Sequence, residues 1–164
     1  MRVIGIDPGL RRAGWGVVEM TGSRLRHVAD GVCESGAGGF GERLARLHAG
    51  LCEVVAAHAP DAAAIERTFV NADPAGALRL GQARGVALLA LAQAGLAITE
   101  LAPAEVKKAV TGAGRAEKAQ IALMVGRLLP GARAATHDAW DALAIAICAL
   151  HRAPPALRAR VSAA

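Results

Sequence analysis

The sequence has few aromatic residues, only three cysteines and no long apolar run. Phenylalanine and tryptophan make up 2% of the 164 residues, and tyrosine is absent. The cysteines are far apart without a Cys-x-x-Cys pair, which argues against a disulfide framework and against a zinc site. No apolar stretch reaches the ~20 residues that span a bilayer, and the N-terminus turns polar too soon for a signal peptide. We therefore expect a reduced, cytoplasmic protein that does not enter a membrane.

Lysine is also scarce, although the chain is basic overall. The formal net charge is +5, and the three lysines (Lys107, Lys108 and Lys118) lie close together in the sequence. Arginine supplies most of the positive charge, which a biased genome composition can produce as well. The charge favours a polyanionic partner such as nucleic acid, and a merely basic protein is the alternative.

The chain contains one series of strand-like and helix-like segments, with no internal repeat and no linker. Apolar alternation and turn signals predict an antiparallel meander of three strands, at 2–6, 15–20 and 24–33. Helices are expected at 40–58, 76–94, around Lys107, at 116–129 and at 137–151, with strands at 61–66 and 97–101. The alanine content of 61–66 leaves a helix as the alternative there. This order predicts an α/β fold, a mixed sheet with helices on both faces. We expect one domain over residues 1–152 and a flexible tail over 153–164.

Four carboxylates occupy unusual positions. Asp7 and Glu66 each end an apolar strand-like run, and Asp138 and Asp141 share one face at the start of the last expected helix. Singly, each has an ordinary explanation: a turn residue before Pro-Gly, a solvated strand end, and partners of the helix dipole. One shared site is the more economical explanation of all four. Oxygen ligands without a cysteine cluster favour Mg²⁺ or Mn²⁺ over zinc.

These carboxylates belong to an ordered set of motifs. The set comprises IGIDPG at 4–9, IE at 65–66, ALRLGQARG at 77–85, the stretch 106–118 and HDAWDALA at 137–144. In this order and spacing, from residue 2 to about 151, the chain resembles the RuvC family of Holliday-junction resolvases. The resemblance implies an RNase H-like fold, with a five-stranded mixed sheet whose first three strands are antiparallel.

The resemblance also implies a chemistry for the acidic residues. Asp7, Glu66, Asp138 and Asp141 would bind two Mg²⁺ ions per active site, with Mn²⁺ as the alternative. The protein would then be a structure-specific DNA endonuclease of homologous recombination and DNA repair. It would cut a four-way DNA junction by paired symmetric nicks that leave a 5′-phosphate and a 3′-hydroxyl. Lys118 would stabilise negative charge on the phosphate.

Other side chains would hold the DNA. Phe69, an aromatic residue in a polar loop, would contact the junction centre, and core packing is the alternative. Taken as a bare motif, the stretch around 111–118 is better explained by a helix C-cap glycine and a surface lysine. The resemblance reverses this preference and places Lys107 and Lys118 near the scissile phosphate. The remaining expected DNA contacts are Arg79, Gln82, Arg84 and Arg115.

Two residues beside the acidic pair have open roles. His137 either lies at the helix start facing solvent or supports the metal site. Trp140 stands where a small residue would be more usual, and it either packs in the core or alters access to the site.

Gly81 and Gly85 would leave a flat patch on the helix expected at 76–94. Close packing against the sheet is the common explanation of such a patch. The resemblance instead implies a homodimer with this region near the two-fold axis, which would present two equal sites to a roughly two-fold junction. A branch-migration helicase complex is a further partner that we consider.

Three other functions share some of these features. A sugar kinase or actin-like ATPase has a similar first phosphate loop, but it needs a duplicated domain that this chain is too short to hold. A related RNase H-like nuclease that acts on RNA is a nearer alternative. A junction-binding scaffold without catalysis is the non-enzymatic one.

Overall fold

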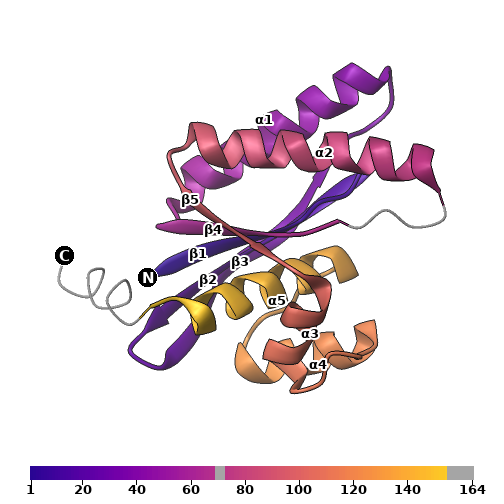
Figure 1. The fold of residues 1–164 in the computed structure, drawn as a ribbon. Helices are drawn as coiled ribbons and strands as arrows, with labels where there is room; N and C mark the ends of the chain where they lie inside the picture. Colours follow the sequence, from indigo (N-terminus) through magenta and orange to yellow (C-terminus); the bar gives the residue numbers. More distant parts are fainter. Residues whose placement is uncertain (69–72, 155–164) are drawn as a thin grey trace.

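A five-stranded sheet runs through the molecule between two layers of helices (Figure 1). The computed structural model describes residues 1–68 and 73–154. The strands are β1 (Arg2–Asp7), β2 (Arg12–Thr21), β3 (Arg24–Glu34), β4 (Ala62–Glu66) and β5 (Ala97–Leu101). The helices are α1 (Phe40–His58), α2 (Pro74–Gln93), α3 (Pro103–Thr111), α4 (Lys118–Leu128) and α5 (His137–Arg152). Phe69 and residues 155–164 of the expected tail lie outside the described residues.

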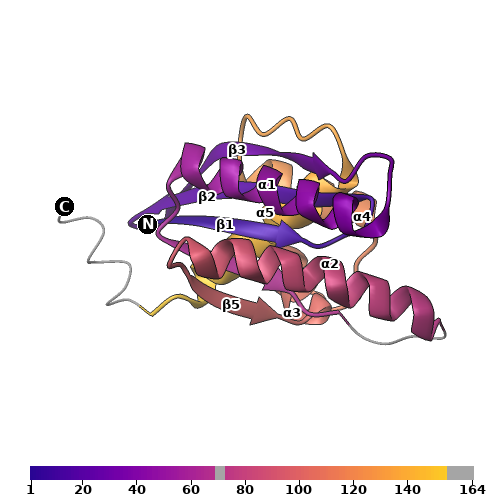
Figure 2. The same cartoon turned by 90° about the horizontal axis from the view of Figure 1, so that it is seen from above.

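The sheet is mixed, as the sequence predicts. Its strand order is β3-β2-β1-β4-β5. Figure 2 shows β3, β2, β1 and β5 from top to bottom, with α1 and α2 in front of the sheet. β1, β2 and β3 pair antiparallel, whereas β4 pairs parallel with both β1 and β5. β2 begins at Arg12, before the expected residue 15, because its pairing with β3 continues as far as Arg12 opposite Glu34.

Two apolar cores hold the layers together. Ile4 and Ile6 of β1 face the core under α1 and α2, while Val3 faces the core under α3, α4 and α5. A strand buried on both faces needs apolar side chains at successive positions, which explains the unbroken apolar run before Asp7. None of the helices in the described ranges is both long enough and apolar enough to cross a membrane, and Cys33, Cys52 and Cys148 are free thiols.

Two glycines allow α5 to lie directly on the sheet. A Cβ atom on Gly5 would stand 2.2 Å from the main-chain oxygen of Ala142, and one on Gly14 would stand 2.1 Å from that of Asp138. Only glycine permits such contacts, because no side chain can occupy that space. The N-terminal end of α5 is therefore held against β2 where β2 pairs with the end of β1.

Candidate active site

Strand pairing and helix packing bring the four predicted carboxylates to one end of the sheet. β1 and β4 are parallel neighbours with Ile6 opposite Ile65, so Asp7 and Glu66 follow at the same edge. The other two, Asp138 and Asp141, lie in the first turns of α5, which rests on β1 and β2.

The start of α5 is fixed by its own cap. Thr136 is the N-cap residue, and its Oγ1 accepts a hydrogen bond from the main-chain N–H of Ala139 at 3.2 Å. An N-cap of this kind satisfies one of the free N–H groups of the first turn. The direction in which the two α5 carboxylates leave the helix is therefore defined by local sequence as well as by packing.

The carboxylates are close enough to repel one another. Burial raises the pKa of Asp7 to about 7, and the negative charges of Asp141, Glu66 and Asp138 add to the effect. Burial followed by the charge of Asp141 also raises the pKa of Glu66. The pKa of Asp141 is raised by its burial, against the opposing charge of Lys118. Such shifts arise where anions share a desolvated space.

Cations border this acidic cluster. The Nζ of Lys118 lies 3.7 Å from Oδ2 of Asp141, and the Nε of Arg12 lies 3.3 Å from Oδ2 of Asp138. The positive charge of Lys107 acts to lower the pKa of Glu66. These contacts bring a lysine from α3 and another from α4 to the carboxylates.

His137 is exposed at the first position of α5. Its charge acts to lower the pKa of Asp141, so the ring is near the cluster. Trp140, in contrast, packs on the core, with its ring edge 3.9 Å from the place a Cβ of Gly126 in α4 would take. This position settles its role as a core residue.

The donor set fits a hard divalent cation. All four side chains offer carboxylate oxygens, and a bound cation relieves the repulsion that raises the pKa of Asp7. Within residues 1–68 and 73–154, no group of three or more acidic, histidine or cysteine side chains is arranged so that it could hold a metal ion as it stands. The carboxylates are thus neighbours that would still have to draw together around an ion.

Lys107 and Arg115 line one hollow of about 520 Å³ beside the cluster. Its other walls come from the segment that joins α3 to α4, including Gly114 and Glu117. The helix α3 ends at Gly112, whose φ of 79° suits glycine. Gly112 is therefore the C-cap of α3, as the ordinary explanation of this stretch has it. Lys107 and Arg115 nevertheless line the same hollow.

Arg84 is engaged inside the protein. Its Nε donates to the main-chain oxygen of Glu66 at 3.0 Å, and its Nη2 pairs with the carboxylate of Glu100. Its side chain is only 15% exposed. Arg79 and Gln82, the other α2 residues expected to contact DNA, are exposed and line a hollow of about 510 Å³ together with Phe40.

The outer face of α2 carries the two glycines noted in the sequence. A Cβ on Gly81 or on Gly85 would meet no atom of the described residues within 4 Å, so neither glycine serves close packing against the sheet. Leu78 and Leu89 on the same helix are 68% and 51% exposed. This leaves an apolar stripe with a flat centre.

Arg12 is the residue of the site that sequence reasoning missed. The available signal was its place three residues after Gly9 of the Asp-Pro-Gly turn and two residues before Gly14. In an antiparallel hairpin that position returns to the end of β1. Its contact with Asp138, however, depends on where α5 docks.

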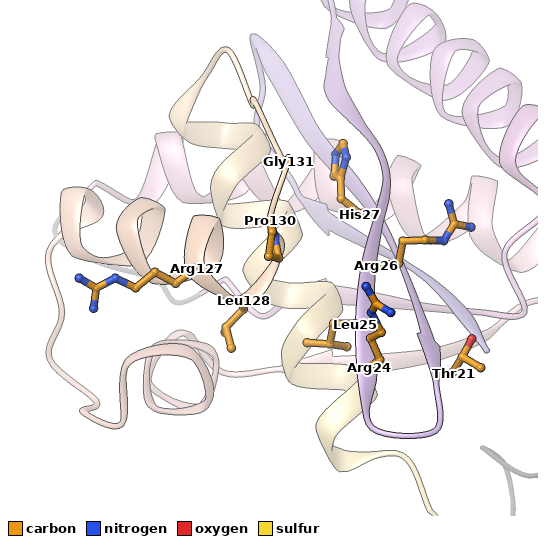
Figure 3. Close-up of a pocket in the computed structure, with 9 residues that line it drawn as sticks. All are labelled: Thr21, Arg24, Leu25, Arg26, His27, Arg127, Leu128, Pro130 and Gly131. Atoms are coloured by element: carbon orange, nitrogen blue, oxygen red, sulfur yellow. The ribbon is translucent and has the colours of Figure 1, made fainter.

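A hollow of about 830 Å³ lies at the other end of the sheet. It is lined by the β2–β3 hairpin and the end of α4, and the hairpin lies beyond Arg2, away from Asp7. Figure 3 shows the apolar side chains of Leu25, Leu128 and Pro130 between arginines on either side. No carboxylate lines this hollow, so it lacks the chemistry predicted for the site.

Comparisons with known proteins match this chain to one family over nearly its whole length. The family model described as crossover junction endodeoxyribonuclease RuvC matches residues 3–149. The crossover junction endodeoxyribonuclease RuvC of Paracoccus denitrificans is 59% identical over 164 residues, covering 99% of this chain and 100% of the relative. The structure of T. thermophilus RuvC in complex with a Holliday junction substrate has 34% identity and a TM-score of 0.83, covering 99% of this chain and 96% of that one.

A more distant structure supports the fold alone. The yeast mitochondrial Holliday junction resolvase Ydc2 is 14% identical, with a TM-score of 0.66, and the match covers 98% of this chain and 82% of that one. The RNase H-like fold expected from the sequence is confirmed by these neighbours.

Proposed function

Because the chain belongs to the RuvC family of crossover junction endodeoxyribonucleases, we propose that it resolves four-way DNA junctions by hydrolysis of phosphodiester bonds. The observation that carries the proposal is the cluster of Asp7, Glu66, Asp138 and Asp141, with Lys118 beside Asp141. The proposed role is in homologous recombination and DNA repair.

Each site would hold two divalent cations, Mg²⁺ or alternatively Mn²⁺. Their ligands would be the four carboxylates of Asp7, Glu66, Asp138 and Asp141. When bound, such ions activate water and stabilise the leaving oxygen in a displacement at phosphorus. A water oxygen forms a bond to phosphorus, the bond from phosphorus to the 3′ oxygen breaks, and that oxygen takes a proton. The products are a 5′-phosphate and a 3′-hydroxyl.

The cationic side chains would hold and neutralise the phosphate. Lys118 pairs with Asp141 in the free protein, and it would stabilise the charge that develops on the scissile phosphate. Lys107 and Arg115 would bind neighbouring phosphates from their shared hollow. His137 would support the carboxylates from the start of α5.

The remaining proposed contacts concern the junction itself. Phe69 would contact the junction centre, and Arg79 and Gln82 would face the DNA from the exposed side of α2. Arg84 would act mainly on Glu66, because its guanidinium already bonds within the protein.

We also propose a homodimer through α2. The exposed stripe of Leu78, Gly81, Gly85 and Leu89 supports it, because two such stripes can pack backbone against backbone. Two equal sites would then give paired, symmetric nicks. A branch-migration helicase complex is a further proposed partner, for which no surface is assigned.

Residues 1–152 would act as one nuclease domain, followed by a tail over 153–164. The proposed location is the cytoplasm, and the three free thiols agree with a reducing compartment.

The test uses a labelled four-way junction and a linear duplex of the same sequences, with Mg²⁺ or with EDTA. We expect symmetric nicks in the junction only, dependent on the ion, and lost in Asp7→Asn while binding persists. Asp61→Asn is the matched control, because Asp61 precedes β4 at the opposite end of the sheet. Tight binding without cutting would support the scaffold, and cutting of an RNA–DNA hybrid in place of the junction would support the RNA nuclease.

A further inference from the structure

A hollow of about 550 Å³ lies next to the acidic cluster. Its lining comes from β2 with the turn before it, from β3, and from α1 with the segment before it, whereas Lys107 and Lys118 belong to α3 and α4. It is lined by Arg11, Arg12 and Arg43 together with the segment Glu34–Gly38. Arg12 belongs to both places, since its Nε lies 3.3 Å from Oδ2 of Asp138. The hollow therefore borders the carboxylates directly.

The walls of this hollow are fixed by hydrogen bonds. Ser35 is 1% exposed, and its N–H donates to the main-chain oxygen of Arg11 at 2.9 Å. Arg43 donates from Nε to Oγ of Ser35 at 3.1 Å and from Nη2 to the oxygen of Leu10 at 3.0 Å. These bonds lock the turn between β1 and β2 to the segment that enters α1.

The three arginines that line the hollow differ in how many of their hydrogen bonds and ion pairs are already made within the protein. The Arg43 guanidinium is committed to the wall. Arg11 is exposed and has no ion pair among the residues that the structure describes, and half of the Arg12 side chain is exposed. Glu34, opposite Arg12 in the β2–β3 pairing, is the one anion in the lining. The hollow thus offers two arginines to a ligand and carries an excess of positive charge.

We propose that this hollow is a phosphate-binding subsite for the DNA strand next to the cleaved bond, with Arg11 and Arg12 as its contacts. The inference rests on the proposed function and adds a second cationic wall to the site, on other elements than those that carry Lys107 and Lys118. DNA backbone would then be gripped by both walls beside the acidic cluster, which itself repels phosphate. Arginine suits the task because its planar fork can bond two phosphate oxygens together.

Arg12 can pair either with Asp138 or with a phosphate in the hollow, because both would use the same guanidinium. Pairing with Asp138 holds it at the edge of the cluster in the free protein. A phosphate in the hollow would compete for the same guanidinium, so junction binding would loosen the hold of Arg12 on Asp138.

The experiment measures junction affinity in EDTA, where no cutting occurs, over a series of salt concentrations. Each phosphate contact contributes about −0.9 to the slope of log affinity against log salt. We expect Arg11→Gln and Arg12→Gln each to reduce the slope by about one such unit and to weaken binding about 5- to 10-fold at low salt. Thermal unfolding checks that both variants fold.

Arg24→Gln is the matched control. Arg24 is exposed and lines the hollow at the far end of the sheet, as Figure 3 shows, so it removes the same charge without touching the proposed subsite. The inference is overturned if Arg11→Gln and Arg12→Gln keep the wild-type slope, or if Arg24→Gln lowers it equally. A wild-type protein that does not prefer the junction to a duplex would instead overturn the proposed function.

A double-mutant comparison isolates Arg12 from general charge effects. Asp138→Asn and Asp141→Asn remove the same charge, but only the first frees Arg12 from its partner. Arg12→Gln should therefore weaken binding at least twofold more in the Asp138→Asn background than in the Asp141→Asn background. Equal losses in both would contradict a shared role of this arginine.

Discussion

Arg84 donates a hydrogen bond from Nε to the main-chain oxygen of Glu66 at 3.0 Å. The same guanidinium pairs with Glu100 on β5, so it ties the ends of two neighbouring strands together. Glu66 thereby has a fixed main chain although it is the last residue of its strand. The relationship makes Arg84 a positioning residue for a proposed metal ligand.

Arg84→Gln is expected to weaken Mg²⁺ binding and to slow junction cutting about 10- to 100-fold, as loss of an outer-shell partner commonly does. Junction affinity in EDTA should change less than twofold. Titration calorimetry measures Mg²⁺ binding, and a binding assay in EDTA measures junction affinity. The comparison is Arg79→Gln, which removes the same charge from the exposed face of α2. A lower salt slope for Arg84→Gln would instead support the direct DNA contact predicted from the sequence.

Asp7→Asn should stabilise the metal-free protein as the pH rises. The fold raises the pKa of Asp7 from 3.8 to about 7, so it favours the protonated side chain. That contribution is complete below pH 3.8 and is lost as the pH rises towards 7. Asparagine does not ionise, so the variant avoids this loss in the free energy of unfolding, which in the wild type amounts to at most about 4 kcal/mol.

Urea unfolding in EDTA between pH 5 and 8 measures this difference. The stability gap between Asp7→Asn and wild type should widen with pH. A gap that stays constant with pH would mean that the fold does not raise the pKa of Asp7.

Lys118→Met should separate catalysis from folding. The Lys118 side chain is 67% exposed, so its ion pair with Asp141 is screened and contributes less than about 1 kcal/mol to stability. Cutting should nevertheless slow roughly 10²- to 10³-fold, because a cation at the phosphate is lost. Single-turnover cutting rates and thermal melts test this, with the exposed Lys108→Met as control. Full activity in Lys118→Met would remove this lysine from the mechanism.

Gly14→Ala should damage both the fold and the acidic cluster. Its Cβ would stand 2.1 Å from the main-chain oxygen of Asp138, so α5 would have to move away from β2. We expect a loss of about 2–4 kcal/mol in the free energy of unfolding. Gly41→Ala, whose Cβ would meet nothing within 4 Å inside α1, should instead gain up to about 1 kcal/mol. Equal stability of the two variants would contradict the observed docking of α5.

Leu89→Glu should disrupt the proposed homodimer. A charge within an apolar contact is costly to desolvate, so light scattering should find a monomer at concentrations where the wild type is dimeric. Leu123→Glu is the control, because Leu123 is also exposed, at 56%, but lies on α4. If both variants remain dimeric, the interface is not on this face of α2.

Much of the fold could be predicted because local patterns decide it. The helix at 40–58 and the strand at 97–101 have the limits expected from their apolar spacing and from neighbouring glycine and proline. The four carboxylates could also be singled out, because each interrupts or follows an apolar pattern where a charge needs a reason.

The contacts around the carboxylates could not be predicted in the same way. Arg84 reads as a surface residue of a long helix, yet its partners are Glu66 and Glu100 on two parallel strands. Likewise, Arg12 meets Asp138 only because glycines let α5 press against β2. Both depend on distances between elements, about which the local pattern of a sequence carries no information.

The acidic cluster joins the first strand of the chain to the last helix. Asp7 and Glu66 lie side by side once β1 and β4 pair, but Asp138 and Asp141 arrive only when α5 docks. The complete set of proposed metal ligands therefore cannot assemble until α5 has been synthesised. A chain that stops before α5 would carry Asp7 and Glu66 but neither Asp138 nor Asp141, and we expect it not to cut the junction.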